Sequence, residues 1–309
     1  MHARGYTLVA AAAVLWALIG LFSRSLLDQG ITPLEIAFWR ALLAGVAFTL
    51  HALAVGRLRV RDGVDLLRLT GFALVGVTLF YAALVLAIDT GGISLAFVLL
   101  YTAPAFVTLL AWPLLGERID ARTLVLVALA LCGVVMVAFG GGDGTGGVRV
   151  SAASIGWGLA AGISYASYYL FGKWVLARYE PVTIFAFVLP IGALGLLPFV
   201  DFGPKSALAW LALVALSLTS TYLAYLAYYS GLRHVPASRA VLVATVEPVA
   251  AAALAAAVYG ERLGPWGVAG GALILVAAVG ASLRRTRRGV HSRPGGASAA
   301  AAGAGPERR

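Results

Sequence analysis

The chain has 309 residues, of which 61% are hydrophobic and 12% are charged, about half the charged share of a soluble globular protein. This composition excludes a water-soluble globular domain. The formal net charge of +10 does not indicate nucleic-acid binding, because Lys and Arg gather in short gaps between apolar blocks and near the C-terminal end. The single cysteine, Cys132, lies inside an apolar block, so we expect no intrachain disulfide and no metal site.

Apolar blocks of about 20 residues recur along the chain, and this is the length that crosses a hydrocarbon core of ~30 Å. They are too long for membrane strands and lack the alternation of a barrel wall. The first block is also too long for a signal-peptide core, so we expect a retained helix. The sequence therefore predicts an all-α membrane protein with ten transmembrane helices, over residues 6–27, 34–55, 66–88, 93–115, 121–139, 154–175, 182–200, 207–229, 237–259 and 265–283.

Most Lys and Arg residues outside the blocks fall on the side that includes the N-terminus. The other side carries only Arg24, Arg149, Lys205 and Arg262. The positive-inside rule then predicts a bacterial-type cytoplasmic (inner) membrane protein with both termini in the cytoplasm.

A glycine-rich connector divides the chain into two halves of five helices each. We expect a first unit over 1–139, the connector over 140–150, a second unit over 151–283 and a disordered basic cytoplasmic tail over 284–309.

The two halves are related by an internal repeat with an offset of 144 residues. Because each unit has an odd number of helices, the second copy should enter the membrane from the opposite side, and inverted repeats are typical of alternating-access transporters. The repeat pairs Tyr81, Ser94, Pro104, Gly116, Glu117 and Arg118 with Tyr225, Ser238, Pro248, Gly260, Glu261 and Arg262.

Two stretches that carry this repeat, GISLAFVLLYTAPAFVTLLAWPLLGERI and VPASRAVLVATVEPVAAAALAAAVYGERL, resemble the signature of the EamA-type transporters of the drug/metabolite transporter superfamily. The similarity covers nearly all of residues 6–285, including AFWRALLAG around Arg40. It implies ten helices, cytoplasmic termini and the movement, often the export, of amino acids or related metabolites. It does not imply one substrate.

Pro104 and Pro248 each fall near the middle of a predicted helix, where a missing N–H and a ring clash open the hydrogen-bond ladder. Interrupted helices at corresponding positions of two halves indicate a transport site. We therefore expect a cavity between the helices over 93–115 and 237–259. The alternative is that both prolines only bend helices for packing.

Glu247 and Arg40 are charged residues inside apolar helices. A charge at the bilayer centre costs roughly 2.5–3.5 kcal/mol, so such residues usually face a cavity, a counter-ion or a proton path. Glu247 could bind a substrate ammonium group or carry a proton, and Arg40 could hold a substrate carboxylate by a forked contact. The alternatives are a structural ion pair between the two, a structural hydrogen bond from Glu247, or snorkelling of Arg40.

Aromatic residues gather on the segments that should face the cavity, where hydroxyl groups can orient a polar solute. Any single one could instead serve packing or the membrane interface. We rank Tyr81 and Tyr225 highest because the repeat pairs them. Ser94 and Ser238 are expected to cap helices. The other aromatic candidates are Trp16, Tyr101, Tyr165, Tyr168, Tyr169 and Tyr222.

Glu117 with Arg118, and Glu261 with Arg262, end the two interrupted helices. They could form alternating inner and outer gate contacts, although charged pairs near loops are often only structural.

The sequence predicts a secondary transporter that moves, in the export direction, small polar metabolites such as amino acids. Its expected partners are the solute, the lipid bilayer and, if Glu247 is used for coupling, protons; no cofactor is expected. A membrane-embedded enzyme is disfavoured because the four histidines lie outside helix centres and no HExxH motif or acid cluster is present. A membrane scaffold without flux is the second alternative. The sequence does not indicate an oligomeric state.

Overall fold

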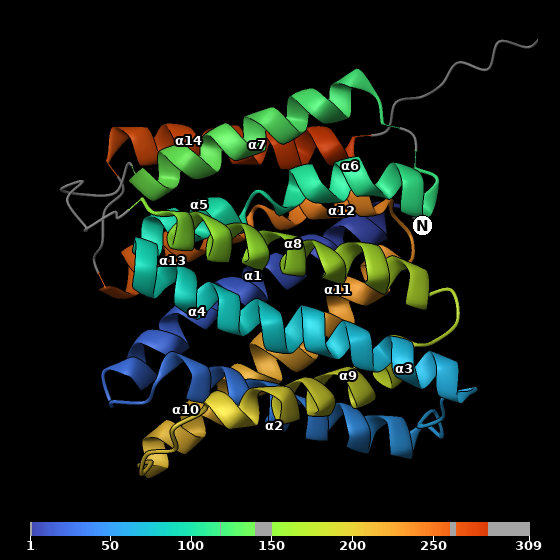
Figure 1. Ribbon diagram of the computed structural model, residues 1–309. Helices are drawn as coiled ribbons and strands as arrows, with labels where there is room; N and C mark the ends of the chain where they lie inside the picture. Colours follow the sequence, from blue (N-terminus) through green and yellow to red (C-terminus); the bar gives the residue numbers. More distant parts are fainter. Residues whose placement is uncertain (1, 118, 140–149, 260–263, 284–309) are drawn as a thin grey trace, which may run out of the picture.

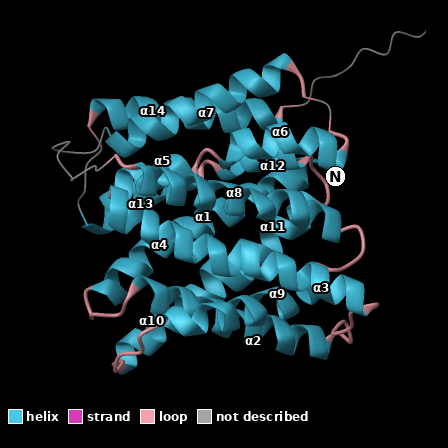
Figure 2. Cartoon of the chain, in the orientation of Figure 1, coloured by secondary structure: helices cyan, strands magenta, loops and turns pink. Residues whose placement is uncertain are grey.

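The computed structural model describes residues 2–117, 119–139, 150–259 and 264–283. Within these ranges every regular element is a helix and no strand occurs (Figure 2), as the sequence predicts. The first part of the chain forms α1 (His2–Leu27), α2 (Pro33–Ala54), α3 (Gly63–Phe72), the π-helix η1 (Ala73–Leu79), α4 (Phe80–Gly91), α5 (Ile93–Leu100), α6 (Ala103–Leu115) and α7 (Ala121–Phe139). The second part forms α8 (Ala152–Val175), α9 (Pro181–Leu196), the 3₁₀-helix η2 (Leu197–Phe199), α10 (Ala207–Ser217), the π-helix η3 (Leu218–Leu223), α11 (Ala224–Leu232), α12 (Ala237–Ala244), α13 (Glu247–Tyr259) and α14 (Pro265–Ser282).

Nine helical stretches in the described chain are long and apolar enough to cross a membrane. The tenth predicted segment is α8, whose 24 residues are about 36 Å long at 1.5 Å per residue. Its many Gly, Ser and Tyr residues make it less apolar than the other nine. The chain is thus a multi-pass membrane protein, and many of its large apolar side chains, such as Leu50, Leu211 and Trp266, are exposed on the outside of the bundle, where lipid can cover them.

The helices lie side by side, and their ends form two opposite faces of the bundle (Figure 1). The N-terminus and the start of α3 lie at one side of the picture and the start of α10 at the other. Helices α7 and α14 cover one flank, α2, α9 and α10 cover the opposite flank, and α8 and α1 run between them. We call the side with the chain's N-terminus the N-terminal face.

Side-chain caps mark where several helices begin. The side-chain oxygens of Thr32, Asp62 and Ser206 each accept a hydrogen bond from the backbone N–H three residues later, at the starts of α2, α3 and α10. Ser151 and Ser154 form a reciprocal capping box at the start of α8. These contacts satisfy N–H groups that have no partner inside the helix.

The helix boundaries repeat with the same offset of 144 residues. The caps Asp62 and Ser206 differ by this offset, and so do the limits of α5 and α12 and those of α6 and α13. Both helical stretches that follow these caps contain a π-helical segment, η1 in the first half and η3 in the second. The π-helical segments were not predicted from the sequence.

Equivalent loops of the two halves lie at opposite faces of the bundle. Lys205, in the loop before α10, forms an ion pair with Glu35 at the start of α2. Its counterpart Arg61, in the loop before α3, donates its backbone N–H to the Tyr179 hydroxyl at 3.0 Å, near the end of α2. The 22 residues of α2 separate these two sites by about 33 Å. An inverted repeat requires this arrangement.

Small residues allow the closest helix contacts. A Cβ atom on Gly133 of α7 would lie 2.6 Å from the carbonyl oxygen of Gly270 of α14, and the reverse contact would also be 2.6 Å. Any larger side chain here would force these two helices apart, so this pair of glycines allows α7 and α14 to pack closely.

Candidate functional site

The two helices that contain Pro104 and Pro248 are both interrupted. Tyr101 and Thr102 separate α5 from α6, and the two residues before Glu247 separate α12 from α13. Each proline then lies at the second position of the following helix, where its missing N–H costs no helical hydrogen bond. The predicted helix breaks are therefore present, and they turn each predicted span into two half-helices.

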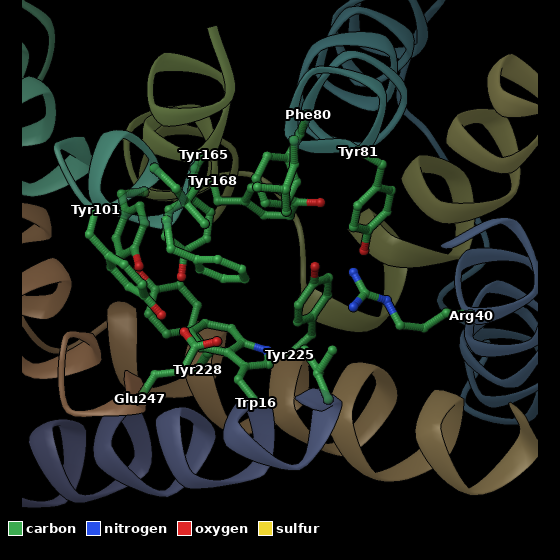
Figure 3. Close-up of a pocket in the computed structure, with 15 residues that line it drawn as sticks. Trp16, Arg40, Phe80, Tyr81, Tyr101, Tyr165, Tyr168, Tyr225, Tyr228 and Glu247 are labelled. Carbon is green, nitrogen blue, oxygen red and sulfur yellow. The ribbon is translucent and has the colours of Figure 1, made fainter. Parts of the chain in front are cut away.

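One cavity of about 120 Å³ lies beside these breaks. A single water needs roughly 10–15 Å³ on this measure, so the cavity has room for a solute of several non-hydrogen atoms. The sequence predicts a cavity between the two interrupted helices alone. In the structure α1, α2, α4, α8 and α11 also contribute lining residues. The lining residues are Trp16, Ile19, Arg40, Phe80, Tyr81, Leu84, Phe97, Leu100, Tyr101, Tyr165, Tyr168, Tyr169, Tyr225, Tyr228 and Glu247 (Figure 3).

Nine of the ten charged and aromatic candidates from the sequence line this cavity, namely Trp16, Arg40, Tyr81, Tyr101, Tyr165, Tyr168, Tyr169, Tyr225 and Glu247. The tenth, Tyr222, does not line it, and its hydroxyl lies 2.7 Å from Nδ1 of His51.

Arg40 occupies one end of the cavity. Its guanidinium group points toward the hydroxyl groups of Tyr81 and Tyr225 (Figure 3), and its Cζ lies 4.4 Å from the centre of the Tyr81 ring. The residue is only 9% exposed, and its Nε has no hydrogen-bond partner. A cation–π contact offsets about 0.5–2 kcal/mol, less than the roughly 2.5–3.5 kcal/mol that a central charge costs. Among the described residues Arg40 forms no ion pair, so the cation–π contact alone does not offset the cost of its charge.

Glu247 occupies the other end, as the first residue of α13. The hydroxyl groups of Tyr101 and Tyr165 face its carboxylate closely enough to donate hydrogen bonds (Figure 3). The positive end of the α13 dipole also favours a negative charge at this position. No ion pair joins Arg40 and Glu247 among the described residues, so the structure does not contain the structural pair considered from the sequence.

The cavity collects unused hydrogen-bond donors. Seven buried side-chain polar atoms of the described residues lack a partner, and five of them belong to residues that line this cavity. Buried polar groups are nearly always paired, and an unpaired one costs about 1–3 kcal/mol. A ligand with acceptor oxygens could satisfy these groups at one site. The five atoms are Trp16 Nε1, Arg40 Nε and the hydroxyl oxygens of Tyr81, Tyr168 and Tyr228.

Ring contacts hold the aromatic walls in place. Trp16 contacts the rings of Tyr225 and Tyr228, with centroids 6.0 and 5.1 Å apart, and Phe80 stacks on Tyr165 at 5.4 Å. Edge-to-face and offset-stacked pairs each add about 0.5–1.5 kcal/mol beyond their burial. These contacts stabilise the positions of the aromatic side chains around the cavity.

Six lining residues were not predicted. Four of them lie three or four positions from a predicted aromatic residue, namely Ile19, Leu84, Phe97 and Tyr228. Side chains at this spacing share a helix face, so it could have identified them. Phe80 and Leu100 directly precede Tyr81 and Tyr101, so this spacing does not identify them.

Of the four gate candidates, only Glu117 lies in the described chain; Arg118, Glu261 and Arg262 lie outside it. The carboxylate of Glu117 accepts hydrogen bonds from the backbone N–H groups of Ala237 and Ser238, at 2.7 and 3.1 Å, and from the Ser238 hydroxyl at 2.6 Å. The sequence-based prediction that Ser238 caps this helix is wrong. The N-cap residue is Pro236, which has no acceptor side chain, so Glu117 supplies the acceptor oxygens instead. Nothing is described of the Ser94 side chain.

Known proteins with this sequence pattern are transporters. The profile of the EamA-like transporter family matches residues 3–139 and again residues 152–283. An uncharacterized transporter of Archaeoglobus fulgidus is 27% identical over 272 residues, which cover 88% of this chain and 93% of the relative. The uncharacterized transporter YwfM of Bacillus subtilis is 27% identical over 276 residues, covering 87% and 90%. A crystal structure of a protein that is 18% identical superposes with a TM-score of 0.78, covering 91% of this chain and 97% of the other, and it shows the fold alone.

Proposed function

The chain belongs to the EamA-like transporter family, and we propose that it is a secondary transporter that exports small zwitterionic metabolites, such as amino acids, by alternating access. We further propose that it lies in the cytoplasmic membrane with both termini in the cytoplasm, because Lys and Arg dominate the N-terminal face.

The observation that carries the proposal is the cavity with opposite charges at its two ends. Arg40 and the unpartnered Tyr81 hydroxyl can bind a carboxylate, since a guanidinium group forms forked contacts with planar anions. Glu247, with the hydroxyl groups of Tyr101 and Tyr165, can bind an ammonium group. A small zwitterionic metabolite carries both charged groups, and a solute of several non-hydrogen atoms fits the volume of the cavity.

The repeated architecture supports alternating access. We propose one unit over residues 1–139 and an inverted second unit over 151–283, joined by the connector 140–150 and followed by the tail 284–309. The repeated helix boundaries and the two separate family matches support this division. Two similar halves of opposite orientation can exchange conformations and expose one central site to either side. In this proposal Glu117 with Arg118, and Glu261 with Arg262, contribute to the two gates.

Coupling is assigned to Glu247. A carboxylate at mid-depth that forms no ion pair in the described structure can exchange a substrate ammonium group for a proton. Such an exchange would link solute movement to the proton gradient without any cofactor.

The experiment is flux in proteoliposomes that contain the purified full-length chain. Radiolabelled amino acids, tested one at a time, should move across the membrane only when protein is present. The corresponding amines and amides, which lack the carboxylate, should move at least about tenfold more slowly, a difference of about 1.4 kcal/mol. Absence of flux for every amino acid would remove the proposal and favour a scaffold, whereas conversion of a solute would favour an enzyme.

A further inference from the structure

The connection between α11 and α12 is held by charged side chains from two other helices. On one side, Nζ of Lys173 from α8 donates to the carbonyl oxygens of Leu232 and Val235, at 2.5 and 2.7 Å. On the other side, Glu117, just beyond α6, accepts from Ala237 and Ser238. The cation thus binds the carbonyl end of α11 and the anion binds the amide end of α12, and each sign suits the helix dipole it meets.

This connection lies between the cavity and an opening at the N-terminal face. Leu232 is one turn after Tyr228, which lines the cavity, while the eight residues of α12 carry the chain about 12 Å to the break before Glu247. At the face itself, Lys173 and Glu117 line an open vestibule of about 360 Å³. Movement of the connection would therefore shift two walls of the cavity together.

A third charged residue, Arg233, forms contacts at the start of the connection. Arg233 donates to the carbonyl oxygen of Tyr179 at 3.0 Å, and its guanidinium group lies 3.5 Å from the Glu180 carboxylate. This pair is partly exposed and weak. The contacts of Lys173 and Glu117 are more enclosed and involve charge-assisted hydrogen bonds, which are roughly twice as strong as neutral ones.

We propose that Lys173 and Glu117 form a charge latch on the α11–α12 connection, and that its release opens the path from the vestibule to the substrate cavity. The proposal rests on the proposed transport function. It adds Lys173, which the sequence analysis did not select, and it gives Glu117 a defined set of partners. The latch is closed in this structure.

The test measures opening directly, without a substrate. In a full-length chain with Cys132→Ser, Val235→Cys introduces a thiol at a position that is 1% exposed beside the latch. Inside-out vesicles are treated with a membrane-impermeant maleimide. Lys173→Gln and Glu117→Gln should each raise the labelling rate about tenfold, which corresponds to about 1.4 kcal/mol. Arg59→Met, which removes an exposed cation from the same face, should leave the rate unchanged.

A second reporter separates gating from general loosening. Ala209→Cys is also buried, at 1% exposure, but lies at the start of α10 near the opposite face. Its labelling from that face should not rise in the latch variants. An unchanged rate at position 235 in both variants at normal abundance, or an equal rise at 209, would overturn the latch. Because labelling needs no solute, faster labelling in a chain without flux would retain the latch and reject the transport proposal.

Discussion

Tyr81→Phe offers a sharp test of the site because the Tyr81 hydroxyl is buried without a partner. An unpaired buried polar group costs about 1–3 kcal/mol, so its removal should leave the empty protein as stable as before or more stable by about 1 kcal/mol. The phenyl ring remains, and so does the ring face for Arg40. If the hydroxyl binds the solute, the variant loses a hydrogen bond worth about 0.5–1.5 kcal/mol. The KM for flux should then rise about two- to tenfold.

Tyr229→Phe is the matched control. Its hydroxyl is equally buried, but it donates to the Tyr168 carbonyl oxygen at 2.9 Å and does not line the cavity. Loss of this bond should lower the free energy of unfolding by about 1 kcal/mol. The KM should stay the same. The two variants are thus expected to change stability and transport in opposite ways, although each removes one oxygen atom.

The assays are thermal unfolding in detergent, followed by intrinsic fluorescence, and flux in proteoliposomes. A change of 1 kcal/mol shifts Tm by about 2–4 °C in soluble domains of 150–250 residues, which sets the scale for this chain. Added solute should also raise Tm less in Tyr81→Phe than in the unmodified protein. A decrease in Tm of Tyr81→Phe as large as that of Tyr229→Phe, with an unchanged KM, would show that the Tyr81 hydroxyl does not bind the solute.

Three further variants test the rest of the site. Pro248→Ala restores an N–H at the helix break and should impair flux at normal membrane abundance. The control Pro113→Ala, at an exposed position inside α6, should not impair flux. Equal flux in both variants would show that Pro248 has no role in the mechanism. Glu247→Gln should abolish the pH dependence of flux, and failure to change either flux or its pH profile would exclude coupling through this residue. Since Arg40 and Glu247 form no ion pair in the described structure, combining Arg40→Ala with Glu247→Ala should not restore the abundance lost in either single variant, as measured by immunoblot; recovery would show that they pair.

Residue type and depth predicted much of the cavity. Arg40 and Glu247 were identifiable because a charge inside an apolar helix is costly and usually has a function. Pro104 and Pro248 were identifiable because proline interrupts the hydrogen bonds of a helix. Their meeting at one cavity was not derivable from a single helix. It depends on how seven helices pack, and packing is fixed by contacts between residues far apart in sequence.

The sequence patterns did not predict polar contacts between residues that are distant in the chain. Ser238 looks like a cap by position, yet the acceptor comes from Glu117, 121 residues earlier. Lys173 looks like a topology signal near a helix end, yet its ammonium group donates to the carbonyl oxygens of Leu232, at the end of α11, and Val235, in the connection after it. Hydrophobic periodicity and capping patterns describe only the helix in which a residue lies. They therefore do not identify a hydrogen-bond partner on a distant helix. The π-helical segments η1 and η3 were missed for a related reason, since one additional residue per turn hardly alters an apolar run.

The tyrosines of the cavity follow the symmetry of the repeat, whereas its two charged residues do not. Tyr81 and Tyr225 are equivalent by the offset, and both face Arg40 (Figure 3). Glu247, in contrast, has Ala103 as its counterpart, and the single Arg40 comes from α2 of the first half. In the proposed mechanism, a zwitterion held between Arg40 and Glu247 therefore bridges the two halves and keeps one orientation in both states. When the two halves exchange conformations, the cavity opens to the other side of the membrane. Arg40 and Glu247 remain in contact with the solute during this change.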